Sequence, residues 1–112
     1  MMINEIKETL QAETLTGMPY TDFDIKGAYS ADLMSDVLAF CNSELLLITA
    51  LTNAQVIRTA EFADIRVIIF VQGKRPDIDA VALSEEKGIL LLATRLPMFE
   101  VCGRLYGKGL RS

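Results

Sequence analysis

Histidine is absent from the 112 residues, and this absence excludes more chemistry than any other feature of the composition. Histidine is the commonest general base and the commonest protein ligand for transition metals. Catalysis by Ser-His-Asp or Cys-His groups is therefore excluded. The two cysteines, Cys41 and Cys102, are far apart and form no Cys-x-x-Cys pair. A zinc site would need carboxylates and two isolated thiols, so we predict no metal site and no cofactor.

Long apolar segments are lacking as well. No run approaches the ~18 residues of a membrane-spanning helix, and Glu5 and Glu8 make the first nine residues unlike a signal peptide. We therefore expect a cytoplasmic protein with no membrane partner. In that compartment Cys41 and Cys102 should be reduced, and both are predicted to be buried on apolar helix faces.

Positive charge is sparse in the first part of the chain. Residues 1–65 carry three cations and ten acids, whereas residues 66–112 carry eight cations and five acids, and the net charge is −4. An acidic chain without a long basic run is a poor nucleic-acid binder, so we predict no nucleic-acid partner. The mildly basic second half still allows a local site for a small anion.

The chain is apolar for its length, with 51% hydrophobic residues and a mean hydropathy of +0.31. Residues 1–112 are best interpreted as a single domain. A domain this small has difficulty burying so much apolar surface by itself, which favours a homodimer that covers the remainder. The alternative is a well-packed monomer.

The segment Arg66–Pro76 predicts the fold. Val67 to Val71 form a continuous run of β-branched and aromatic residues, which is typical of a strand buried on both faces of a parallel sheet. Gln72-Gly73 then predicts a turn, and Asp77 begins a helical pattern. Similar apolar runs at Leu45–Thr49 and Ile89–Ala93 are also followed by helical patterns, so the centre is expected to be βαβαβα with parallel strands and helices packed on the sheet.

Shorter elements precede this centre. Ile3, Ile6 and Leu10 predict an N-terminal helix with Asn4 as its N-cap, and short strands are expected at Thr14–Thr16 and Asp24–Tyr29. Asp32 is predicted to cap the next helix. The last helix is expected from Pro97 to Tyr106, with a close helix contact at Gly103, and Gly107–Ser112 is expected to be a polar, frayed tail.

The carboxyl ends of parallel strands meet at one edge, where open α/β folds bind ligands. The residues at this edge that suit an anion are Thr49, Asn53, Gly73, Lys74, Arg75, Thr94 and Arg95. We predict that they form an anion site if one exists. One isolated glycine is a weak signal, and a solvated turn between strand and helix explains the same residues.

Two further groups of residues allow a functional and a structural interpretation. Asp32 and Asp36, four residues apart on one predicted helix, suit Mg²⁺ binding or acid–base chemistry, but an N-cap and an exposed acid explain them more simply. A dimer interface is predicted on the outer faces of two helices, at Met34 and Phe40 and at Phe99 and Tyr106. Core packing is the alternative for Phe99 and Tyr106.

Three segments together resemble the DRTGG domain family. GAYSADLMSDVLA (Gly27–Ala39) is similar to its "G-x-Y-x-x-D-L-L-S-x-V-M-A" stretch, IKETLQAETLTG (Ile6–Gly17) to its opening helix and strand, and TRLPMFEVCGRLY (Thr94–Tyr106) to its C-terminal helix. The resemblance covers nearly the whole chain. It implies a small α/β module, related to the domain that precedes the catalytic part of HPr kinases, that self-associates and has a regulatory or scaffolding role without chemistry of its own.

The chain departs from the residues that give the family its name. Leu51-Thr52-Asn53 stands where the family often has Asp-Arg, and Val71-Gln72-Gly73 stands where it has Thr-Gly-Gly. The leading hypothesis is a non-catalytic module that acts as a homodimer through protein contacts or a small regulatory ligand. One alternative is a sensor of adenine nucleotides or other phosphate-containing ligands, by analogy with the CBS domains that accompany the family. A second is a small enzyme that uses Asp32, Asp36, Lys74 and Arg75 on a phosphorylated substrate.

Overall fold

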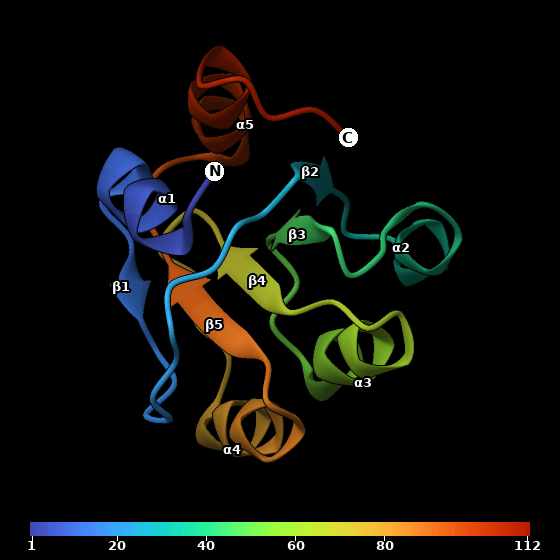
Figure 1. Ribbon diagram of the computed structural model, residues 1–112. Helices are drawn as coiled ribbons and strands as arrows, with labels where there is room; N and C mark the ends of the chain where they lie inside the picture. Colours follow the sequence, from blue (N-terminus) through green and yellow to red (C-terminus); the bar gives the residue numbers. More distant parts are fainter.

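The computed structural model describes all residues, Met1–Ser112, and consists of one five-stranded sheet between two layers of helices (Figure 1). The sheet order is β1-β5-β4-β3-β2. The strands are β1 (Glu13–Thr14), β2 (Gly27–Ser30), β3 (Leu45–Thr49), β4 (Val67–Phe70) and β5 (Leu90–Ala93). The helices are α1 (Ile3–Leu10), α2 (Met34–Phe40), α3 (Ala54–Phe62), α4 (Ile78–Lys87) and α5 (Met98–Gly107).

The four strands from β2 to β5 are parallel and lie side by side in the order of the sequence. The predicted parallel arrangement of the three central strands is therefore confirmed. Because right-handed crossovers that all advance in one direction fall on one side of a sheet, α2, α3 and α4 cover the same face. The chain changes face only at its ends, where α1 and α5 cover the opposite face (Figure 1).

Each face of the sheet supplies half of a buried core. Side chains alternate along a strand, so Ile69 of β4 packs beneath α1 and α5, and the neighbouring Phe70 packs against α2, α3 and α4. Both residues are fully buried. No helix is long and apolar enough to cross a membrane.

α4 begins where the sequence predicts a helical pattern, at Asp77. Asp77 occupies the N-cap and its Oδ1 accepts a hydrogen bond of 2.8 Å from the amide of Ala80. Gly88 ends the helix with φ = 72°, a conformation that favours glycine.

Two predicted caps were wrong, because more distant partners take their place. α1 begins after Met2, which occupies the N-cap position. The Asn4 amide, inside the first turn, donates a hydrogen bond to the carboxylate of the distant Asp22, so the side chain of Asn4 does not cap the helix. Asp32 lies before α2, whose N-cap position is Leu33. The Asp32 carboxylate instead accepts bonds from Thr49 Oγ1 and the Ala50 amide, both at 2.8 Å, and thereby ties the end of β2 to the end of β3.

The C-terminal segment is ordered against the sheet, so the prediction of a frayed tail was wrong. Leu110 is buried in the core beneath α5, and the carbonyl of Arg111 accepts a hydrogen bond from the Ala28 amide. Gly27 permits this contact, because a Cβ at that position would lie 1.9 Å from the Arg111 carbonyl oxygen. The tail therefore covers the free edge of β2, which would otherwise present unpaired backbone groups.

Candidate functional site

A crevice opens where the chain changes from one face of the sheet to the other. After β4 the chain continues into α4 on one face, and after the adjacent β5 it continues into α5 on the opposite face. Adjacent parallel strands whose connections diverge in this way leave a crevice outside their carboxyl ends, which is the usual ligand site of open α/β sheets. The crevice here has a volume of about 540 Å³.

The crevice brings together four of the seven residues predicted for an anion site: Gly73, Arg75, Thr94 and Arg95. Thr49, Asn53 and Lys74 do not line it. Thr49 ends β3 and Asn53 lies just beyond it, and the connection from β3 runs into α3 on the same face as α4, so no crevice opens there.

The loop after β4 is held by its own backbone. Gln72 and Gly73 both have positive φ, at 62° and 71°. Their amides donate to the carbonyls of Leu96 and Thr94 in the loop after β5, at 2.9 and 3.0 Å. These bonds fix the two sides of the crevice relative to each other. They also occupy the Gly73 amide, which is therefore not free to cradle an anion.

Among the crevice side chains, the two arginines are the groups suited to an anion. Both are exposed, and Arg75 forms an ion pair with Glu13 of β1, whereas Arg95 forms no ion pair. Thr94 is buried, and its hydroxyl donates to the carbonyl of Leu10 at 2.7 Å, so it has a structural role. The crevice is therefore cationic at Arg95, with a second cation held beside a carboxylate.

The aspartates that suggested metal or acid–base chemistry do not form a pair on one helix. Asp32 lies outside α2 and is engaged by Thr49 and Ala50, as described above. Asp36, within α2, lies near Tyr29, where burial together with the charge of Asp36 raises the pKa of the phenol. No group of three or more Cys, Asp or Glu side chains is arranged to hold a metal ion.

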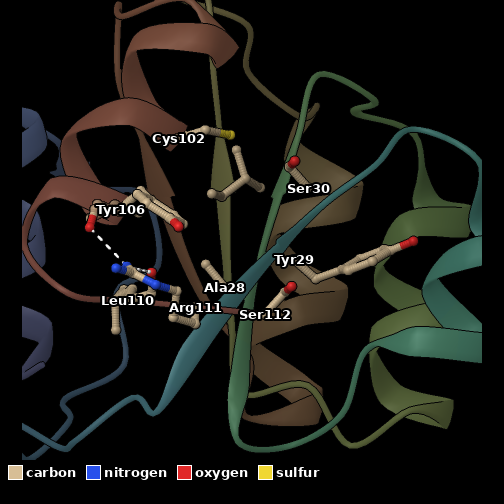
Figure 2. A pocket seen from close by; sticks show the side chains of 10 residues that line it. Ala28, Tyr29, Ser30, Cys102, Tyr106, Leu110, Arg111 and Ser112 are labelled. Atoms are coloured by element: carbon tan, nitrogen blue, oxygen red, sulfur yellow. Dashed lines mark hydrogen bonds between the residues drawn. The ribbon is translucent and has the colours of Figure 1, made fainter.

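A second cavity, of about 450 Å³, lies between β2, α5 and the C-terminal segment (Figure 2). Cys102 and Tyr106 of α5 line one side, and Ala28 and Ser30 of β2 line the other. The ring of Tyr29 points away from the cavity, as Figure 2 shows, and packs with the core beneath α2. No sequence signal pointed to this cavity, because it depends on the docking of a tail that was expected to fray.

The C-terminal segment forms the polar rim of this cavity. The Arg111 guanidinium carbon lies 3.6 Å from the centre of the Tyr106 ring. The same guanidinium donates to the carbonyls of Tyr106 and Leu110, at 3.0 and 2.8 Å. Stacking and hydrogen bonds thus hold Arg111 and Tyr106 together at the cavity entrance.

The residues predicted for a dimer interface separate into three situations. Met34 is buried beneath α2 and cannot contribute an outer surface, so that part of the prediction was wrong. Phe40 is exposed on α2. Phe99 and Tyr106 are exposed on α5, on the opposite face of the sheet, so the alternative of core packing is excluded for both.

Cys41 is buried as predicted, whereas Cys102 is only half-buried.

One solved structure reports on the fold. The chain is similar to the crystal structure of the CBS and DRTGG domains of the regulatory region of Clostridium perfringens pyrophosphatase, complexed with the activator diadenosine tetraphosphate. The TM-score is 0.72 at 17% sequence identity, and the match covers 96% of this chain and 46% of that chain. No protein-family model and no curated protein sequence matches. The likeness shows the fold, spans less than half of the neighbour's length, and supports the DRTGG-like α/β fold that the residues predict.

Proposed function

We propose that this chain is a non-catalytic regulatory domain that responds to a small phosphate-containing ligand in the crevice between the loops after β4 and β5. The observation that carries the proposal is that Arg75 and Arg95 line one crevice at the point where the connections diverge. The structural neighbour is a regulatory region that takes a nucleotide activator. A nucleotide is accordingly the first ligand to test.

The electrostatics of the crevice suit a phosphate. Arg95 has no carboxylate partner, and Arg75 is paired only with the exposed Glu13. Exposed ion pairs are worth about 0–1 kcal/mol, so a phosphate group that carries more charge can replace the carboxylate at little cost. Arginine also binds phosphate through two parallel hydrogen bonds, which strengthens that exchange.

The enzyme alternative has less support. It requires Asp32 and Asp36 to act with Lys74 and Arg75 on a phosphorylated substrate. Asp32 accepts two hydrogen bonds from the end of β3, and Lys74 does not line the crevice. No acid–base group therefore faces the two arginines except Glu13, which neutralises one of them.

Calorimetric titration with diadenosine tetraphosphate, ATP, AMP, pyrophosphate and inorganic phosphate tests the proposal. A ligand present at 100 times its Kd should also raise the free energy of unfolding by about 2.7 kcal/mol. The Arg75→Ala/Arg95→Ala double variant should abolish binding, and Arg58→Ala, an exposed arginine on α3, should leave it unchanged.

Glu13→Gln provides a test of opposite sign. Removing the carboxylate that competes for Arg75 should tighten phosphate binding, whereas a nonspecific charge effect would be equally strong for Glu61→Gln on α3. Absence of binding by every ligand in the set, or binding that survives the double arginine substitution, would refute the proposed site.

A further inference from the structure

The second cavity has the composition of a site for a small organic molecule (Figure 2). Its walls are mainly apolar and come from β3, α5 and the C-terminal segment, at Ile48, Cys102, Leu105 and Leu110. Its volume of about 450 Å³ lies near the lower end of the range of ligand pockets. A cavity of this kind suits a single aromatic ring or a branched aliphatic group.

Arg111 is the one charged side chain that lines the cavity, and it forms no ion pair. Its Nη1 donates both hydrogen bonds to the carbonyls of Tyr106 and Leu110, whereas Nε and Nη2 donate to no group of the chain. These two nitrogens form an edge of the guanidinium that can bind a carboxylate through two parallel hydrogen bonds. Because the Tyr106 ring and the two carbonyls already fix the guanidinium, little freedom is lost when a carboxylate binds.

We propose that this cavity binds a small carboxylic acid whose body is an aromatic ring or a branched alkyl group. The carboxylate accepts hydrogen bonds from Nε and Nη2 of Arg111 at the entrance, and the body lies against Ile48, Cys102 and Leu105. The entrance suits the charge, because Arg111 is exposed there and the carboxylate keeps part of its hydration. The apolar walls stabilise the body by removing it from water.

This cavity and the crevice select different anions, and no residue lines both. The crevice offers two arginines, which suit the several charges of a phosphate group. The cavity offers one arginine among apolar walls, where a second negative charge would lose water without gaining a partner. The inference therefore goes beyond the proposed function and does not depend on it.

A series of related compounds, titrated into the isotope-labelled chain and followed by NMR, tests the proposal. Phenylacetate should shift the amide signals of Ala28, Ser30 and Cys102, which surround the cavity. Phenylacetamide lacks the charge and should bind at least about tenfold more weakly, because the charged hydrogen bonds are lost. Acetate lacks the body and should not bind. No shift with millimolar phenylacetate, or shifts mainly at Arg75 and Arg95, would overturn the proposal.

The same series identifies the source of the carboxylate. N-acetylphenylalanine presents a ring and a carboxylate as the end of a peptide does. Its amide group finds no partner between apolar walls, so it should bind more weakly than phenylacetate. Tighter binding of N-acetylphenylalanine would overturn the assignment to a small free acid.

Cys102→Leu tests the location by filling the cavity from α5. The larger side chain occupies space that the ligand needs, so the affinity for phenylacetate should fall at least about tenfold. Gly103→Leu is the matched control, since it adds the same side chain at the next position, outside the cavity. A Cβ at Gly103 would meet nothing within 4 Å, so the close helix contact expected there is absent and that prediction was wrong. Binding by Gly103→Leu should be unchanged, and equal binding by Cys102→Leu would overturn the proposed site.

Arg111→Met tests the role of the charge. It should lower the affinity for phenylacetate to that for phenylacetamide and leave the affinity for phenylacetamide unchanged. The Arg75→Ala/Arg95→Ala variant loses two charges from the crevice and should bind phenylacetate as the unaltered chain does. An Arg111→Met chain that still prefers the acid to the amide, or loss of phenylacetate binding in the crevice variant, would overturn the assignment of the carboxylate to Arg111.

Cys102→Leu keeps the test decisive if Arg111→Met does not fold. The phosphate titration uses other compounds and another pair of arginines, so failure of the proposed function and failure of this inference are distinguishable.

Discussion

Replacing Gly27 with alanine should detach the C-terminal segment from the sheet. The added Cβ would lie 1.9 Å from the Arg111 carbonyl oxygen and 2.9 Å from Leu45 Cδ2. The leucine methyl is the end of a side chain that can shift, but the Arg111 carbonyl is backbone and cannot turn away without moving the chain. Because β2 is fixed in register with β3 by its parallel pairing, the tail is the part that moves.

The cost follows from what the tail contributes. Loss of the bond from the Ala28 amide to Arg111 costs about 0.5–1.5 kcal/mol, and exposure of Leu110 costs about 1.5–3 kcal/mol. We therefore expect Gly27→Ala to lower the free energy of unfolding by about 2–4.5 kcal/mol, measured by urea denaturation at fixed protein concentration. Gly107→Ala, at a helical glycine with open space around it, should not destabilise.

A chain that lacks residues 110–112 separates this mechanism from strain elsewhere. If the alanine acts by displacing the tail, it should cost little in the shortened chain, since the two changes then remove the same contacts. An equal loss in the full and shortened chains, or a loss below about 1 kcal/mol in the full chain, would refute the reasoning.

Two further outcomes are expected. Burial raises the pKa of the Cys41 thiol to about 11, so at pH 8 a thiol reagent should modify the half-buried Cys102 first. The reactivity of Cys41 should keep rising up to about pH 11. The stability that the protonated Cys41 thiol contributes is present below about pH 9 and should be lost between about pH 9 and pH 11. Mass spectrometry of labelled peptides checks this, and equal labelling at pH 8 would contradict it. Asp32→Ala should cost about 1–3 kcal/mol in chemical denaturation because it removes the acceptor for Thr49 and Ala50, whereas Asp36→Ala should change stability little. Similar effects of the two substitutions would contradict the bridging role of Asp32.

The sheet and most helices could be predicted because their signals are local. The strand at Val67–Phe70 is apolar throughout, as a strand covered on both faces must be, and the three central runs were recognised for that reason. Asp77 and Gly88 act within a few residues of their own positions, so the bounds of α4 were also readable. The parallel order then followed from the helical patterns between the strands.

The errors occurred where a residue acts across the fold. Asp32 looks like a cap in sequence, yet its partners belong to the next strand. Leu110 and Arg111 lie in a segment with the composition of a loose end, and only the distant Gly27 explains why they dock. Composition likewise cannot separate an inner from an outer face of α2, which is why Met34 was assigned to the surface.

The crevice was predicted in part for a related reason. Parallel strands identify the edge at which Gly73, Arg75, Thr94 and Arg95 meet, and this much was accessible from the sequence. Thr49 and Asn53 lie apart from these four residues because the crevice opens only beside β5, where α5 returns over the face of the sheet opposite to α2, α3 and α4. No local pattern in α5 encodes that choice, since its apolar stripe would suit either face.

The attachment of the first strand to the last has a consequence for synthesis. β1 pairs only with β5, and the Thr94 hydroxyl bonds to the Leu10 carbonyl across 84 residues. Proteins emerge from the ribosome with the N-terminal end first. The residues of β1 are therefore synthesised long before those of β5, with which they pair. Until β5 has emerged, the segment Glu13–Thr14 remains an unpaired strand, which makes this interval the one in which the nascent chain most needs protection from other chains.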